Sequence, residues 1–199
     1  WVPGCATGEE AYSIAMLFLE RAAERDIELP LKIFATDVHR GSLEIAAAGS
    51  YDAESVHPLG PARLERFFER DGDRFQVRPS LRRQVVFSQH NLLKDPPFTR
   101  LDLISCRNLL IYLTTSAQQR IMGLFHFALR PTGHLFLGPS ETLGDLAGNF
   151  RMLDNRWRIF AREPAVASGG PSLVANALPR RGDGTPAIDL GVLPKPGLW

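Results

Sequence analysis

Two glycines and two acidic residues lie close together at the start of the sequence, in the segment Gly4-Cys5-Ala6-Thr7-Gly8-Glu9-Glu10. A glycine-containing turn between a strand and a helix lets a ligand approach the backbone closely. The dinucleotide fingerprint G-x-G-x-x-G does not occur here, and a helix that binds phosphate keeps its N-terminus free for the anion. Two carboxylates at this point favour a cationic group such as an ammonium or a sulfonium. Acidic residues also stabilise helix N-termini by about 0.3–1 kcal/mol without any ligand, so this alternative stays open.

Asp37 follows the apolar run 32–36, which predicts a strand. An acidic residue at such a strand end accepts hydrogen bonds from ribose hydroxyls in nucleotide-binding sheets, although it also caps turns and helices in other proteins. A nucleotide-like ligand that carries a positive charge is indicated by the order of these features, which is a glycine loop, then an acidic pair, then an Asp at a strand end. S-adenosylmethionine fits this description better than NAD, and the missing fingerprint disfavours an NAD-dependent oxidoreductase.

A second group of polar residues, Arg107, Asn108 and Tyr112, follows the apolar run 101–106. Ligands of open α/β sheets bind beyond the carboxyl ends of the strands, so these side chains are expected at a substrate site. An arginine there can hold a carboxylate through two hydrogen bonds. Asn91, just after the predicted strand 85–88, is expected along the same edge. The tetrapeptide 95–98, Asp-Pro-Pro-Phe, resembles a motif of amino-group DNA methyltransferases, but it precedes a strand instead of ending one, which favours a plain turn.

The elements that must position these residues alternate between apolar runs and helical patterns, which predicts an α/β fold with a parallel sheet. We expect helices over 9–25 and 42–48, the latter ended by Gly49, and a helix behind a capping box at 115–118. Further strands are expected at 134–137, 150–153 and 157–160. The segment 51–86 interrupts the alternation as an insertion, with a helix over 61–70 and a hairpin formed by 75–77 and the stretch after Pro79. From 163 to 199 the composition is typical of a disordered linker or tail.

The composition excludes several classes of protein. With 199 residues, 44% hydrophobic and 23% charged, the chain suits one sizeable globular core. A formal net charge of +1 gives no reason to expect a nucleic-acid or membrane-surface partner, and no apolar run is long enough to span a bilayer. Cys5 and Cys106 lack metal-ligand spacing, so no metal is expected, and both are interpreted as small buried hydrophobic residues in a reducing, cytoplasmic setting.

With these residues assembled, the chain resembles the CheR-type chemotaxis receptor methyltransferases. The resemblance covers about residues 1–162. The matching segments are Gly-Cys-Ala-Thr-Gly-Glu-Glu-Ala-Tyr-Ser at 4–13, Ala-Thr-Asp-Val at 35–38, Asn-Leu-Leu at 91–93, Cys-Arg-Asn-Leu-Leu-Ile-Tyr at 106–112 and Leu-Phe-Leu-Gly-Pro-Ser-Glu at 135–141.

The resemblance implies a Rossmann-like class I S-adenosylmethionine-dependent methyltransferase fold with a small inserted β-subdomain. It implies methyl transfer to glutamate side chains of chemoreceptors, or of similar acidic receptor proteins, giving methyl esters and S-adenosylhomocysteine. Arg107 and Tyr112 would be the catalytic residues. The residues carried over as cofactor-binding are Gly4, Thr7, Gly8, Glu10, Asp37, Asn91, Leu92, Arg107 and Asn108. Arg78, Arg82 and Arg83 of the insertion could serve an acidic partner, but a solvated basic face is the simpler interpretation.

The match also has departures. The family's N-terminal helical domain has no counterpart, so the sequence is interpreted as an N-terminally truncated catalytic domain at 1–162, cut from a hybrid that fuses methylesterase, methyltransferase and sensor-type domains. The Gly-His-Ser-Glu of many members is Gly138-Pro139-Ser140-Glu141 here. A non-catalytic module that binds cofactor or docks a partner is the alternative function, and the fragment by itself is expected to be weakly active or inactive.

Overall fold

A computed structural model describes residues 1–164 of the chain. These residues form two compact units, of which one spans Val2–His90 and the other joins Trp1 to residues 91–164. The predicted tail lies almost entirely outside the described residues. The interpretation of 1–162 as one domain stays a prediction.

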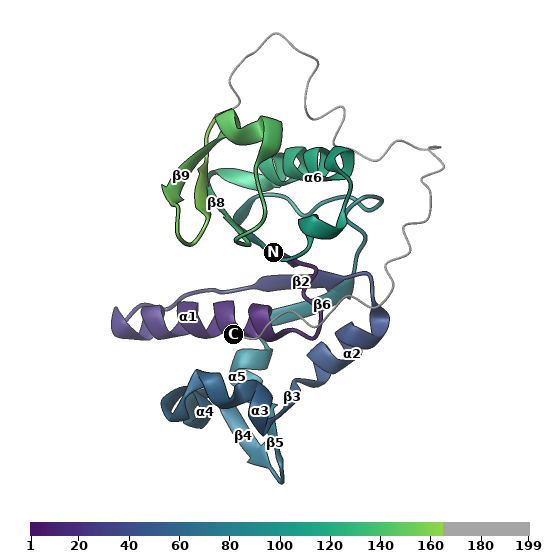
Figure 1. The fold of residues 1–199 in the computed structure, drawn as a ribbon. Helices are drawn as coiled ribbons and strands as arrows, with labels where there is room; N and C mark the ends of the chain where they lie inside the picture. The colour runs from purple at the N-terminus through teal and green to yellow at the C-terminus, as the bar shows by residue number, and fades with distance from the viewer. Residues whose placement is uncertain (165–199) are drawn as a thin grey trace. The chain divides into compact units, whose positions relative to one another are not determined.

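The unit Val2–His90 is built on a parallel sheet in the order β1-β2-β6 (Figure 1). Its strands are β1 (Val2–Pro3), β2 (Ile33–Asp37) and β6 (Val85–Gln89). The helices α1 (Glu9–Glu24) and α2 (Arg40–Ala48) both contact β2 and β6, so they cover the sheet while connecting its strands. Gly49 ends α2 in the left-handed conformation, as its position in the sequence predicts.

The predicted insertion contains a small antiparallel sheet in the order β3-β5-β4. Its elements are β3 (Ser50–Asp52), α3 (Ala53–Val56), η1 (His57–Leu59), α4 (Pro61–Phe67), β4 (Phe68–Asp71), β5 (Arg74–Val77) and α5 (Pro79–Arg82). The predicted hairpin partner after Pro79 was wrong, because that stretch is helical and β5 pairs with β4 instead. Proline is favoured in the first turn of a helix, where its missing N–H costs nothing.

The second unit holds a mixed sheet in the order β7-β8-β10-β9, in which only β7 and β8 are parallel. Its elements are β7 (Leu101–Cys106), η2 (Leu110–Tyr112), α6 (Thr115–Ala128), β8 (Leu129–Leu137), η3 (Gly144–Asn149), β9 (Phe150–Asp154) and β10 (Ile159–Arg162). The N-cap of α6 is Thr114, one residue earlier than predicted, and its side chain accepts a hydrogen bond from the Ala117 amide.

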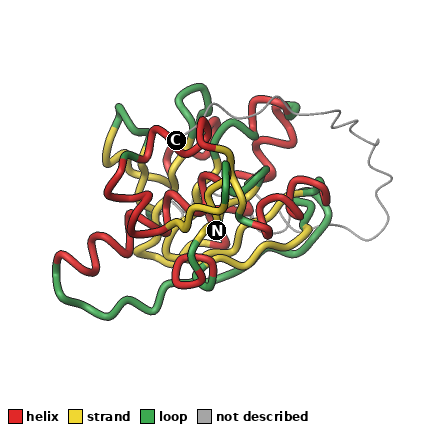
Figure 2. Tube along the Cα trace, turned by 90° about the horizontal axis from the view of Figure 1, so that it is seen from below, coloured by secondary structure: helices red, strands yellow, loops and turns green. Residues whose placement is uncertain are grey.

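Helices and strands alternate along most of the trace (Figure 2), and the predicted α/β class is confirmed. Cys5 and Cys106 are buried as predicted, at 4% and 0% exposure. Trp1 belongs to the second unit, where its carbonyl accepts a hydrogen bond from the Ser105 amide and its ring packs edge-on against Phe98 and Phe125. Within residues 1–164 no helix combines the length and the hydrophobicity that crossing a bilayer requires.

Candidate functional site

The loop after β1 has an unusual backbone. Gly4, Ala6 and Gly8 all have positive φ angles, of 70°, 45° and 96°. At Gly8 a Cβ atom would lie 2.9 Å from the Cβ of Ala46 and 3.1 Å from the Phe87 ring. Only glycine therefore fits at this point, because both the conformation and the close packing exclude a side chain.

Asp37 holds this loop in place. Its Oδ2 accepts a hydrogen bond of 2.9 Å from the Ala6 amide, and its Oδ1 accepts one of 2.9 Å from the His39 amide. The residue is only 6% exposed. A carboxylate has about four lone-pair sites, so two backbone bonds leave acceptor capacity for ligand hydroxyls. The sequence predicted a ligand contact for Asp37, and the structure adds a role in shaping the loop.

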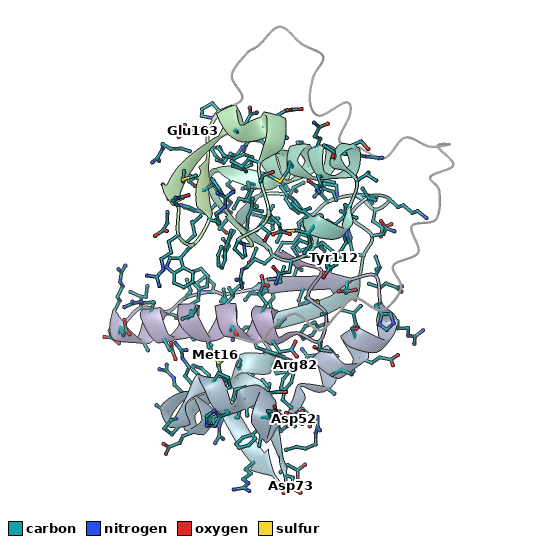
Figure 3. All side chains as sticks on the ribbon, viewed as in Figure 1. Met16, Asp52, Asp73, Arg82, Tyr112 and Glu163 are labelled. Atoms are coloured by element: carbon teal, nitrogen blue, oxygen red, sulfur yellow. The ribbon has the colours of Figure 1, made fainter. Side chains whose placement is uncertain are left out.

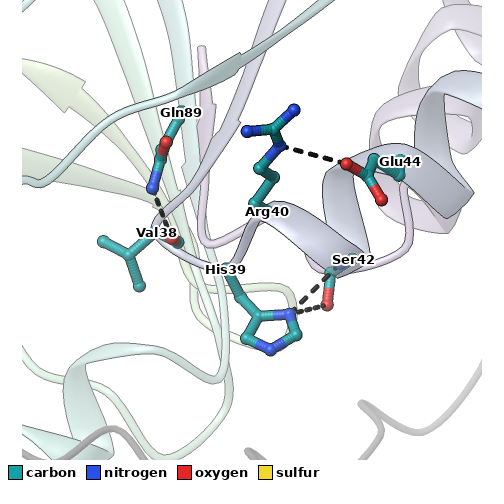
Figure 4. Close-up of polar contacts among 6 residues, drawn as sticks. All are labelled: Val38, His39, Arg40, Ser42, Glu44 and Gln89. Atoms are coloured by element: carbon teal, nitrogen blue, oxygen red, sulfur yellow. Dashed lines mark hydrogen bonds and ion pairs between the residues drawn. The ribbon is translucent and has the colours of Figure 1, made fainter.

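The segment that follows Asp37 is fixed by its own polar contacts (Figure 4). His39 caps α2, since its Nδ1 accepts a hydrogen bond from the Ser42 amide at 3.2 Å. The side-chain amide of Gln89 donates to the Val38 carbonyl at 3.0 Å, which ties this segment to the end of β6. The carboxyl ends of β2 and β6 are therefore held together beside the loop.

Three carboxylates, those of Asp37, Glu9 and Glu10, lie close enough to Cys5 to act on it. Burial raises the pKa of the Cys5 thiol, and the carboxylates of Asp37, Glu10 and Glu9 raise it further because each disfavours a second negative charge. The Thr7 hydroxyl donates to the Glu9 carboxylate at 2.6 Å, so Glu9 is part of the loop's own structure. This arrangement favours a cationic ligand group, which agrees with the interpretation of the acidic pair.

Two buried tyrosines form hydrogen bonds at the loop and at the helix α2 next to it. The Tyr51 hydroxyl donates to the Thr7 carbonyl at 2.8 Å, and the Tyr12 hydroxyl donates to the Ala46 carbonyl at 3.0 Å. Burial raises the pKa of Tyr12 to about 12 and that of Tyr51 further, so both hydroxyls stay protonated and act as donors. Tyr51 is on β3, and the small sheet is thereby bonded to the loop.

In the second unit, Asn91 and Leu92 lie on a turn that Asn91 itself stabilises. The Asn91 Oδ1 accepts a hydrogen bond from the Leu93 amide at 2.9 Å, and the Asn91 amide donates to the Asp95 carboxylate at 2.7 Å. Asp95 is therefore a turn residue, as its position before β7 indicated.

Arg107, Asn108 and Tyr112 follow the carboxyl end of β7 on a single turn. Asn108 is exposed and has a φ of 56°, a left-handed conformation that Asn tolerates better than most residues. The Arg107 guanidinium lies 4.9 Å from the centre of the Phe136 ring, and no hydrogen-bond acceptor is within reach of its buried Nε among residues 1–164. Tyr112 ends the turn η2 with 40% of its surface exposed (Figure 3).

Glu141 is the residue that sequence reasoning missed. Its carboxylate is 2% exposed and accepts three backbone hydrogen bonds, from Leu109 and Leu110 at 2.8 Å each and from Gly138 at 2.7 Å. The only signal in the sequence was its place in the family segment at 135–141. Because two of its three partners, Leu109 and Leu110, come from a distant segment, the burial of Glu141 is not visible in the local pattern.

The three basic residues of the insertion have different environments. Arg78 forms an ion pair with Glu69 at 2.7 Å. Arg82 donates to the carbonyls of Ala47 and Val85 at 3.0 and 2.9 Å. Arg83 is exposed, and its carbonyl accepts from Lys32. Arg78 and Arg82 therefore have structural roles.

The predicted site residues fall into three local groups. Within Val2–His90 the loop gathers Gly4, Thr7, Gly8, Glu10 and Asp37. In the second unit one turn carries Arg107, Asn108 and Tyr112, and another carries Asn91 and Leu92. Their assignment to cofactor and substrate stays a prediction.

The family described as CheR methyltransferase, SAM binding domain, matches residues 1–159. An uncharacterized 104.1 kDa protein of Rhodobacter capsulatus is 49% identical over 169 residues, which are 84% of this chain and 18% of that protein. Chemotaxis protein methyltransferase 1 of Pseudomonas aeruginosa is 35% identical over 77% of this chain and 58% of its own length. The chemotaxis protein methyltransferase of Vibrio parahaemolyticus is 36% identical over 77% of this chain and 57% of its own.

The fold and the loop define an S-adenosylmethionine-dependent methyltransferase domain of the Rossmann-like class, and S-adenosylmethionine is its cofactor. The chain belongs to the CheR methyltransferase family, and the resemblance stated from the sequence is confirmed. It spans less than two thirds of the length of these relatives. The residues of the loop fit the cofactor, because Asp37 keeps acceptor capacity for hydroxyl groups and the carboxylates of Asp37, Glu9 and Glu10 suit a sulfonium.

Proposed function

We propose that the protein transfers a methyl group from S-adenosylmethionine to glutamate side chains of chemoreceptor-type proteins, forming methyl esters and S-adenosylhomocysteine. The observation that carries the proposal is the acidic loop held by Asp37, in a chain of the CheR family. The negative potential of this loop would attract and orient the cofactor's positively charged methionine part.

The loop residues would hold the cofactor. Gly4, Thr7 and Gly8 would present their backbone to it, and Glu10 and Asp37 would accept hydrogen bonds, Asp37 from the ribose hydroxyls. Asp37 has lone pairs left for this because its two protein partners are single backbone amides. Asn91 and Leu92 would contact the adenine, and Asn108, exposed after β7, would add a polar contact.

Arg107 and Tyr112 would act on the acceptor glutamate. A guanidinium binds a carboxylate in a planar, bidentate geometry. The stacking of Arg107 on Phe136 would fix the plane of the Arg107 guanidinium. The exposed Tyr112 hydroxyl would complete the acceptor site beside it. Arg107 forms no ion pair with an acidic residue among residues 1–164, so its guanidinium would be available to a substrate carboxylate.

The chemistry requires little proton transfer. A glutamate carboxylate is ionised near neutral pH and is itself the nucleophile. The bound cofactor supplies an activated methyl group. The protein's contribution would be to align the carboxylate for in-line displacement and to keep water away, so no general base is needed.

The proposal extends to the setting of the protein. Its partners would be the cytoplasmic helices of chemoreceptors or similar acidic receptors, and its location would be cytoplasmic. The proposal includes further signalling domains fused to this one.

A methyl-transfer assay tests the function. The full parent protein is incubated with S-adenosylmethionine carrying a labelled methyl group and with a chemoreceptor cytoplasmic fragment, and base-labile label is counted as methyl ester. We expect Arg107→Ala and Tyr112→Phe to lose most of the transfer. Arg130→Ala is the control, because Arg130 is exposed and its side chain forms an ion pair with Asp102 at 2.7 Å, away from the proposed site residues.

The assay also separates the two candidate functions. Cofactor binding without any labelled ester would favour the non-catalytic module. If Arg107→Ala and Tyr112→Phe both transfer the methyl group at the wild-type rate, the assignment of these two residues to the site is wrong.

A further inference from the structure

We infer that Glu141 is a positioning residue that sets the conformation of the turn carrying Arg107, Asn108 and Tyr112. This inference rests on the proposed assignment of that turn to the cofactor and acceptor site. Glu141 itself would contact neither ligand, because it is buried and its oxygens are occupied by backbone donors.

The parallel pairing of β7 and β8 brings two strand ends side by side. Cys106 and Leu137 are register partners at the last residues of these strands. The chain leaves β7 into the turn at 107–112 and leaves β8 into the tight turn at 138–141. In the second turn the Glu141 amide donates to the Gly138 carbonyl at 3.2 Å. Pro139 occupies the second position of this turn, which favours proline, so the departure from Gly-His-Ser-Glu preserves the turn.

The tight turn directs the Glu141 carboxylate back across both strand ends. Oε2 accepts from Gly138 within its own turn, while Oε1 accepts from Leu109 and Leu110 at the start of η2. The carboxylate therefore takes the place of a helix N-cap for η2 and joins the two turns through one side chain.

The packing at Gly138 excludes a side chain there. A Cβ atom at Gly138 would lie 2.8 Å from Glu141 Oε2 and 3.0 Å from the Asn108 amide nitrogen and side-chain oxygen. The Asn108 backbone is thus packed against Gly138 and precedes the residues that Glu141 binds, although Asn108 as a whole is exposed. Its left-handed backbone, with φ at 56°, costs less for Asn than for most residues and gains from this contact.

Arg158 secures Glu141 from a third element. Its guanidinium donates to the Glu141 carbonyl at 2.8 Å, and its own carbonyl accepts from the Leu137 amide at 3.1 Å. The Glu141 main chain is therefore held from the turn before β10 while its side chain holds the turn after β7. The three backbone donors to its carboxylate explain why Glu141 is tolerated in the interior although it forms no ion pair among residues 1–164.

The test compares Glu141→Gln with the wild-type full-length protein. Glutamine keeps the shape of the side chain, but its NH2 group cannot accept, so at least one of the three amides loses its partner. We expect the dissociation constant of S-adenosylhomocysteine, measured by calorimetry, to rise about tenfold to a hundredfold, the factor that matches one lost charge-assisted hydrogen bond. Amide exchange at Leu109, Leu110 or Gly138 should accelerate about tenfold relative to the amides of β8.

Leu124→Ala is the matched control, because Leu124 is an apolar residue buried on α6 and its truncation destabilises the same unit without removing a hydrogen-bonding group from either turn. Below its melting temperature this variant should bind S-adenosylhomocysteine as the wild type does. Equal affinities of wild type and Glu141→Gln, or equal weakening in Leu124→Ala, would overturn the inference. If the wild type binds S-adenosylhomocysteine but methylates no glutamate, the proposed function is wrong. The comparison of binding affinities then still tests the role of Glu141.

Discussion

Replacing Gly8 by alanine tests whether the loop depends on a close approach between two elements. Gly8 has a φ of 96°, and its missing Cβ would lie 2.9 Å from the Ala46 Cβ. The Ala46 Cβ is fixed to the backbone of α2 and cannot move aside, whereas the Phe87 ring at 3.1 Å can shift slightly. The variant therefore combines backbone strain with overpacking.

The two contributions can be separated with a second glycine. At Gly72, with a φ of 59°, a Cβ would meet nothing within 4 Å, so Gly72→Ala carries backbone strain alone, about 1–2 kcal/mol. Gly8→Ala adds about 1–3 kcal/mol of overpacking, so its unfolding free energy should fall by roughly 2–5 kcal/mol. The stabilisation that alanine gains by restricting the unfolded chain is shared by both variants.

Urea denaturation measures both free energies, and calorimetry measures the affinity for S-adenosylmethionine. We expect Gly8→Ala to lose more stability than Gly72→Ala and to bind the cofactor more weakly, while Gly72→Ala binds normally. Equal losses of stability in the two variants would refute the argument that packing against Ala46 requires glycine at position 8.

Two further predictions concern charged groups. In Asp37→Asn one carboxylate oxygen is replaced by an NH2 group, so the amide of either Ala6 or His39 loses its acceptor. Urea denaturation should show an unfolding free energy lower by about 1.5–3 kcal/mol. An unchanged denaturation midpoint would contradict the role of Asp37 in the loop. Arg63 lowers the pKa of Glu20 by forming a hydrogen-bonded ion pair with it at 2.8 Å. The pair therefore contributes fully to the free energy of unfolding above the ordinary carboxyl pKa, and this contribution is lost as the pH falls through the lowered pKa of Glu20. Arg63→Ala should cost at most about 1 kcal/mol near neutral pH, since both side chains are partly exposed, and a melting-temperature series into acid should show a shallower decline than the wild type.

The sequence predicted the elements that depend on local pattern. The apolar runs located β2, β6 and β7 to within a residue or two, because strands buried in a parallel sheet are apolar along their length. The stretch after Pro79 was misassigned because four residues are too few for a periodic signal, and proline then starts the helix α5.

The candidate site was only partly predictable. Strand ends indicated Asp37 and Arg107, since ligands of α/β sheets bind there whatever the details of the loops. The role of Glu141 depends on the meeting of two turns and a third element, and such long-range contacts leave no periodic trace in the sequence. The hydrogen bond by which Asp37 holds the loop at Ala6 was hidden for the same reason.

The three tyrosines of the chain differ in a way that gives the protein a built-in chemical reporter. Tyr12 and Tyr51 are buried at 0% and 4% exposure, with hydroxyls engaged by carbonyl groups, whereas Tyr112 is 40% exposed. Nitration or iodination of the native protein therefore marks Tyr112 selectively, without any engineered label. Protection of that single residue by a ligand, measured by mass spectrometry, would test the proposed place of Tyr112 beside the acceptor.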